Sequence, residues 1–84
     1  MNTNDVRDLA HARRLAANGE GRAIREQAQV PQSAVAAAIE VTPSAVNRWE
    51  AGTRVPRGRA AIRWVRLLRR LQVVPSSELQ EAAE

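Results

Sequence analysis

The chain has 84 residues and no cysteine, so we expect one small domain without disulfide bonds or a thiolate metal site. Its thirteen basic residues, all of them arginine, exceed nine acidic residues and give a formal charge of +4. No stretch is apolar enough for a membrane span or a secretory signal, so we expect a cytoplasmic protein that does not bind a membrane.

The charge is distributed unevenly along the chain. Residues 51–74 contain seven arginines and no acidic residue, whereas residues 75–84 contain three glutamates and no arginine. The basic segment suits a polyanionic partner. Alanine-rich sequence with few β-branched runs predicts an all-α fold.

The first predicted helix lies within residues 1–18, with Thr3 or Asn4 as its N-cap and Gly19 at its end. A second helical stretch covers about residues 20–28. The first helix is weakly amphipathic, with Val6, Leu9, Ala10 and Ala16 on roughly one side, and the apolar positions of the second stretch are Ala23, Ile24 and Ala28.

Two short helices follow. The first covers about residues 32–39. The second is capped by Thr42, starts with Pro43 and reaches about Ala51, where Gly52 ends it. Two short helices joined by a turn of about four residues predict a helix-turn-helix.

The last long helix is predicted from about Arg59 to Val73, with Pro75 as its end. Ser77 and Gln80 resemble a capping box for a short helix in the acidic tail. The apolar side of the long helix comprises Ala61, Ile62, Val65, Leu68 and Leu71, and an arginine row on the opposite side comprises Arg59, Arg63, Arg66 and Arg70. This row is either a solvated face or a surface that meets acidic residues of another subunit.

The segment Gln32 to Pro56 resembles the helix-turn-helix of the phage repressor/Cro (XRE-type) family. Trp49-Glu50, Gly52 and Pro56 match the family's W-E-x-G-x-x-x-P ending. The family's buried positions are matched by Val35, Ala36, Ile39, Val41, Val46 and Trp49. The resemblance implies a compact four- to six-helix lambda-repressor-like domain. Its motif covers about residues 32–51 within a DNA-binding domain of residues 19–74, which lies between an N-terminal helical extension (residues 1–18) and the acidic tail (residues 75–84).

The second helix of such a motif presents its N-terminal end to base edges in the major groove. Val46 and Trp49 would hold its inner side in the core. The family's base-contact positions then map onto Arg48, Asn47, Ser44 and Pro43. Asparagine pairs bidentately with adenine and arginine with guanine, whereas proline offers only an apolar contact.

The resemblance also implies contacts with the DNA backbone. The expected phosphate contacts are Gln32, Thr42, Arg54 and Arg57. It implies a salt bridge between Arg25 and Glu50, which ties the helix before the motif to the end of the recognition helix. The role of that pair is structural.

Three residues depart from the family pattern. Glu40 occupies the turn position that usually holds glycine, which is unfavourable if its φ is positive. Pro31 replaces the usual serine and removes a side-chain cap. Gly21 replaces an apolar residue, so we expect the helix that contains it to start late or to pack loosely.

The resemblance implies a sequence-specific regulator that binds double-stranded DNA, and we expect a Cro-like repressor that acts by operator occupancy. The alternative is an antitoxin-type module that binds DNA and a partner protein, the latter through the N-terminal helix or the acidic tail. An enzyme is not expected, because the sequence contains no nucleophile–base pair, paired carboxylates, metal cluster or phosphate loop. We expect no cofactor, metal or small-molecule ligand. We expect a homodimer at least on DNA, with residues 71–79 as the first candidate interface.

Overall fold

The computed structural model describes the backbone of residues 1–82 and the side chains of residues 1–72. This part of the chain contains five α-helices and no strand, which confirms the all-α prediction. The helices are α1 (Thr3–Asn18), α2 (Glu20–Gln27), α3 (Gln32–Ile39), α4 (Pro43–Ala51) and α5 (Gly58–Ala82). In this part of the protein, no helix has the length and apolar character needed to span a membrane.

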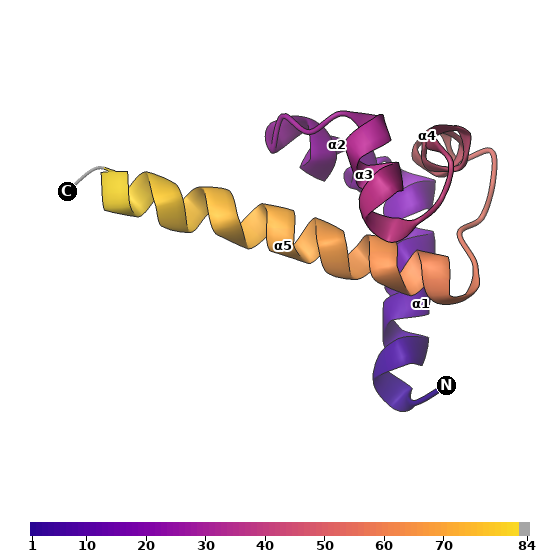
Figure 1. Ribbon diagram of the computed structural model, residues 1–84. Helices are drawn as coiled ribbons and strands as arrows, with labels where there is room; N and C mark the ends of the chain where they lie inside the picture. Colours follow the sequence, from indigo (N-terminus) through magenta and orange to yellow (C-terminus); the bar gives the residue numbers. More distant parts are fainter. Residues whose placement is uncertain (83–84) are drawn as a thin grey trace.

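The helices form one core around the start of α5. α1 crosses α5 near its beginning and also packs against α2 and α4, while α3 packs against α4 and α5. The C-terminal half of α5 extends away from the other four helices (Figure 1). The two helices of the predicted helix-turn-helix, α3 and α4, therefore pack against α5 and α1, respectively.

The helix ends follow local backbone chemistry. Asn2 caps α1, because its Oδ1 accepts a hydrogen bond from the backbone N–H of Asp5 at 2.8 Å. The expectation that Thr3 or Asn4 would be the cap is wrong by one or two residues, since both already lie inside the helix. Gly19 ends α1 with φ at 80°, as predicted, because glycine adopts this left-handed conformation without a Cβ clash.

Trp64 is the largest side chain in the core, and the sequence analysis did not place it there. It is fully buried and its ring lies 5.2 Å from that of Trp49, centroid to centroid. Its spacing of three residues after Ala61 and four before Leu68 fits the buried face of α5. Leu71, which we expected on that face, is only partly buried.

Gly21 makes room for Trp64. A Cβ atom built on Gly21 would lie 2.7 Å from Cζ2 of Trp64, a separation that demands a shift of one of the two. Gly21 is buried and α2 already begins at Glu20. The expectation of a late start for this helix is therefore wrong, because the indole of Trp64 fills the volume that an apolar side chain at position 21 would occupy.

α5 continues beyond Pro75, where we expected it to end, and reaches Ala82. Proline removes the one hydrogen bond that its own N–H would donate, and the helical backbone is retained on both sides of it. Residues 75–82 of the acidic tail are thus part of α5 rather than a separate short helix. The expected capping box of Ser77 and Gln80, and most of the candidate dimer interface, lie outside the residues whose side chains are described.

Candidate nucleic-acid interface

The start of α4 is defined by two adjacent residues. Oγ1 of Thr42 accepts a hydrogen bond from the backbone N–H of Ala45 at 3.1 Å, and Pro43 occupies the first helical turn. Val46 and Trp49 are buried on the inner side of this helix. This anchoring fixes the rotation of α4 about its axis and determines which side chains face outward.

The outward face of α4 carries the four residues predicted to contact bases. Pro43, Ser44, Asn47 and Arg48 are all exposed, and together with Gln32 they line an open hollow of about 280 Å³. A hydroxyl, an amide and a guanidinium thus line one hollow along the exposed face of this helix. These groups supply the donors and acceptors that base edges in a major groove require.

Gln32 connects the two helices of the motif. Its Nε2 donates to Oε1 of Glu50 at 2.9 Å, and its Oε1 accepts from Nδ2 of Asn47 at 3.4 Å. Its backbone N–H lies at the start of α3, where the first helical hydrogen bond runs from Ala34 to the carbonyl of Pro31. Pro31 provides no side-chain cap, as the sequence indicated. The backbone N–H groups of Gln32 and Ser33 precede this bond, and N–H groups at a helix start can donate to an anion.

Arg25 and Glu50 form a buried ion pair between α2 and α4. Nε of Arg25 lies 2.6 Å from Oε2 of Glu50, and Nη2 lies 3.0 Å from Oε1. Nη1 of Arg25 also donates to the carbonyl of Val30 at 2.8 Å. The hydrogen bonds that Arg25 donates to Glu50 raise the pKa of Arg25 above its ordinary value, against the effect of burial. Each of the three guanidinium nitrogens thus donates a hydrogen bond within the protein, which indicates a structural role.

Glu40 lies in the turn between the two helices of the motif. Its φ is 62°, in the left-handed region, although it is not glycine. The turn is stabilised by hydrogen bonds from the N–H of Glu40 to Ala37 and from the N–H of Val41 to Ala36. The motif therefore keeps a left-handed turn at a strained residue.

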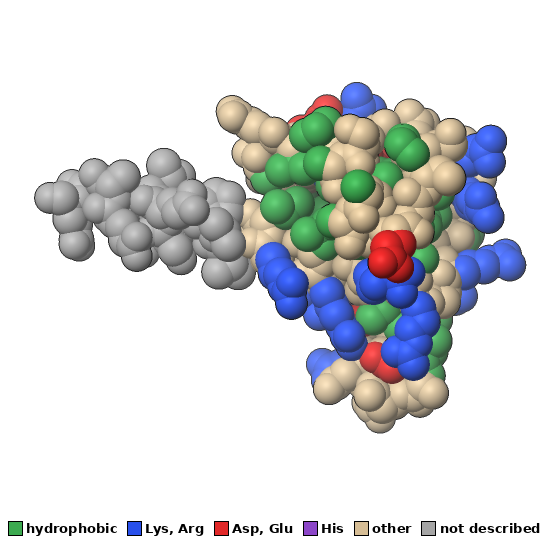
Figure 2. Space-filling model, viewed as in Figure 1, with side chains coloured by type: hydrophobic (Ala, Val, Ile, Leu, Met, Phe, Trp, Pro, Cys, Tyr) green, Lys and Arg blue, Asp and Glu red, His purple; other side chains and the backbone are tan. Residues whose placement is uncertain are grey.

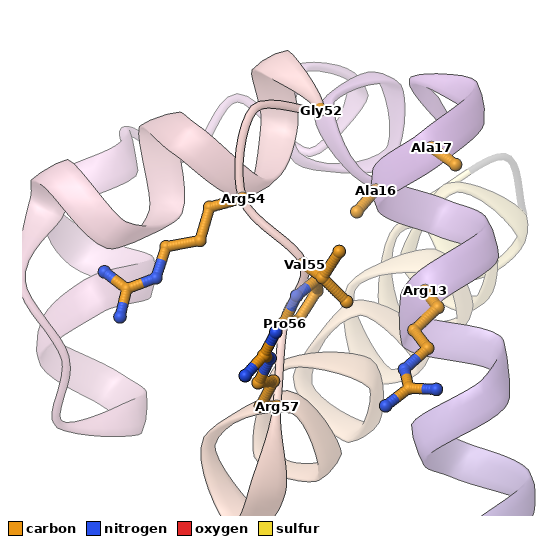
Figure 3. Close-up of a pocket in the computed structure, with 8 residues that line it drawn as sticks. All are labelled: Arg13, Ala16, Ala17, Gly52, Arg54, Val55, Pro56 and Arg57. Carbon is orange, nitrogen blue, oxygen red and sulfur yellow. The ribbon is translucent and has the colours of Figure 1, made fainter.

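The loop after α4 carries the other predicted phosphate contacts. Its start is tied to α4, because the N–H groups of Thr53 and Arg54 both donate to the carbonyl of Arg48, at 3.0 and 3.3 Å. Arg54 and Arg57 are exposed beyond this anchor. Together with Arg13 they line an open hollow of about 640 Å³ (Figure 3), and Arg13 was not among the predicted site residues.

A sequence model described as helix-turn-helix matches residues 22–72, which is more than half of the chain. The chain belongs to the XRE-type helix-turn-helix family. It is therefore a DNA-binding transcriptional regulator of this family, and its partner is double-stranded DNA. Comparison with curated proteins and with solved structures gave no significant match.

In this XRE-type regulator, α1 precedes the matched residues and is held to α5 by ion pairs. Asp5 and Asp8 are buried in α1. Nη2 of Arg66 lies 2.9 Å from Oδ1 of Asp5, and its Nε lies 3.0 Å from Oδ2 of Asp8. Nη2 of Arg69 lies 2.7 Å from Oδ1 of Asp8. Burial raises the pKa of Asp8, but the hydrogen bonds and charges of Arg69 and Arg66 outweigh this and hold it below its ordinary value. In Figure 2, arginine side chains gather around the few acidic atoms where α1 crosses α5.

The arginine row of α5 thus meets acidic residues of its own chain, an arrangement that the sequence interpretation did not consider. Arg59 approaches Asp5 at 4.0 Å. Arg63 instead donates from Nε to the carbonyl of Ile39 at 3.2 Å, at the end of α3. Arg70 is exposed beside α3. Part of the XRE-type regulator's basic charge is therefore paired with carboxylates of its own chain.

His11 of α1 lies beside Arg69 of α5 in this regulator. Its Nδ1 lies 3.3 Å from Nη2 of Arg69, and burial together with the charges of Arg69 and Arg14 lowers its pKa. Among the residues with described side chains, no three His, Asp or Glu groups are placed to hold a metal ion.

Proposed function

We propose that this regulator is a Cro-like repressor that occupies an operator and blocks transcription there. The observation that carries the proposal is the hollow on the exposed face of the recognition helix α4, which is lined by Gln32, Pro43, Ser44, Asn47 and Arg48. Repression by occupancy requires only binding that is both tight and sequence-specific. The groups of this hollow, with the basic loop beside it, are suited to both requirements.

Base recognition is assigned to α4. Arg48 would pair bidentately with a guanine and Asn47 with an adenine, each contributing about 1–3 kcal/mol of discrimination. One N–H of the Asn47 amide is used by Gln32, which leaves its other N–H and its carbonyl oxygen for adenine. Ser44 supplies a hydroxyl and Pro43 an apolar contact, for example with a thymine methyl.

Phosphate contacts would position the domain on the duplex. We assign them to Gln32 at the start of α3, to Thr42 before α4, and to Arg54 and Arg57 in the loop. Thr42, Arg54 and Arg57 are exposed and Gln32 is partly exposed. We further propose that the protein binds DNA as a homodimer, with inverted half-sites about one helical turn apart.

Selection of genomic DNA fragments by the purified protein tests the proposal. The wild type should recover one recurring motif at physiological salt, and Arg48→Ala should lose preference at one guanine position. Arg14→Ala is the matched control, because this exposed arginine lies on α1 outside the hollow. Inverted half-sites would support the homodimer. Recovery of DNA without any preference would contradict operator occupancy and favour the partner-binding alternative.

A further inference from the structure

The hollow between α1 and the loop after α4 is basic at its rim and apolar inside. Arg13, Ala16 and Ala17 line it from α1, at helical spacings of three and four residues that place them on one face. Gly52 and residues 54–57 line it from the loop. Figure 3 shows Arg13 on α1 across the hollow from Val55 and Arg57 of the loop, while Arg54 points away from α1.

α1 is held in a fixed position beside the loop. The carbonyl of Ala16 lies 3.6 Å from a Cβ built on Gly52, so helix and loop are in direct contact where the loop begins. At its other end α1 is fixed to α5 by the ion pairs of its buried carboxylates, Asp5 and Asp8, with Arg66. The position of Arg13 relative to Arg57 is therefore set by the fold.

Charged residues of α1 meet different parts of the molecule. Its two aspartates pair with Arg66 of α5, whereas Arg13 lines the hollow beside the loop. Among the described side chains, the ion pairs include none of Arg13, Arg54 and Arg57. Three arginines thus line one hollow whose apolar wall includes half-exposed Val55 and buried Pro56, and the guanidinium of Arg54 is directed away from α1. A low-dielectric wall strengthens the attraction of such a group for anions.

We infer that Arg13 binds a backbone phosphate of DNA next to those contacted by Arg54 and Arg57. This inference rests on the proposed DNA-binding mode, in which the loop meets the sugar–phosphate backbone beside the recognition helix. That backbone alternates charged phosphates with less polar sugars, which suits an arginine rim around an apolar wall. α1 lies outside the residues matched to the family, so the contact would enlarge the footprint of the family's own motif.

The salt dependence of DNA binding tests the inference. Arg13→Ala should reduce the slope of log K against log salt by about 0.9, the value for one phosphate contact. Affinity should fall about fivefold at physiological salt on both selected and random duplexes. Arg13→Lys should keep the wild-type slope, because it keeps the charge. Arg14→Ala is the control, because that exposed arginine does not line the hollow and should leave the slope unchanged.

Ethylation interference gives a second readout that a merely structural role would not move. The wild type should show one more sensitive phosphate per half-site than Arg13→Ala, on the side of the loop. Equal slopes and equal interference patterns for these two proteins would overturn the inference. Failure of the proposed function would look different, because the wild type would then bind selected and random duplexes equally well. A wild type that binds no DNA would overturn both.

Discussion

Gly21 of α2 and Trp64 of α5 occupy complementary volumes in the core, and the indole ring fills the space where a Cβ at position 21 would lie. That Cβ would be 2.7 Å from Cζ2 and 2.8 Å from Cη2 of Trp64. The volume of the Trp64 indole explains why α2 has glycine rather than a residue of higher helix propensity at position 21. This packing also links two residues that are far apart in sequence.

Gly21→Ala should destabilise the protein, because overpacking in a core costs about 1–3 kcal/mol and outweighs the gain in helix propensity. In the Trp64→Phe background the same substitution should be neutral or stabilising, since phenylalanine lacks the two atoms that clash. Urea unfolding of the two single variants and the double variant measures this coupling. Trp64 Nε1 has no hydrogen-bond partner among the described residues, so Trp64→Phe removes packing but no hydrogen bond. Additive effects would contradict the assignment.

Glu50→Gln should lower the free energy of unfolding by about 3–5 kcal/mol, because it leaves the guanidinium of Arg25 buried without its counter-charge. The two side chains are only 12% and 3% exposed. Glu26→Gln is the matched control, since Glu26 pairs with Arg22 at 3.3 Å on the surface and should contribute less than about 1 kcal/mol. Chemical denaturation measures both variants. Similar losses for the two would show that the buried pair has no special role.

The helices of the motif were predictable from sequence because their signals are local. Thr42, Pro43 and Gly52 act through the backbone within a few residues, and α3 and α4 begin and end where those residues indicated. The outward face of α4 could be predicted because the spacing of Val46 and Trp49 marks its buried side. The resemblance added the site residues, and the structure gathers five of them in one hollow.

The packing of Gly21, the partners of the arginine row and the place of Arg13 could not be predicted, because they depend on contacts between elements that are distant in sequence. Nothing near Gly21 in the sequence indicates that a tryptophan of α5 needs its volume. The arginine row of α5 was ambiguous because its partners, Asp5 and Asp8, are about sixty positions away. Arg13 carries no local signal at all, and only the packing of α1 against the loop places it beside Arg57.

Asp8→Asn should weaken the acid dependence of stability. The pKa of Asp8 is lowered in the folded protein from its ordinary value of 3.8. The unfolded state therefore binds the proton more readily, and the stabilisation is complete above pH 3.8 and lost as the pH falls through the lower folded-state pKa. Thermal unfolding followed across that range should show a smaller fall in Tm for the variant than for the wild type. Parallel profiles would contradict the assignment.

Glu40→Gly should stabilise the protein by about 0.5–1 kcal/mol. The φ of 62° at Glu40 is unfavourable for a residue with a Cβ, and glycine relieves that strain at some cost in unfolded-state entropy. Glu40→Ala is the matched control, because it removes the carboxylate and keeps the Cβ. Denaturant unfolding should show a gain for the glycine variant alone. Equal gains for both would assign the effect to charge rather than to backbone conformation.

Gln32→Ala should weaken the discrimination that Asn47 provides at its base pair. The amide of Gln32 accepts a hydrogen bond from Nδ2 of Asn47 and itself donates to Glu50, so it holds the Asn47 amide in one orientation. Asn47→Ala should lose about 1–3 kcal/mol of preference for its adenine. In the double variant the loss should equal that of Asn47→Ala alone, because residues in one network are not additive. Competition binding with duplexes that differ at single base pairs measures each preference. If Gln32→Ala lowers affinity evenly for all duplexes, Gln32 acts only on the phosphate and does not orient Asn47.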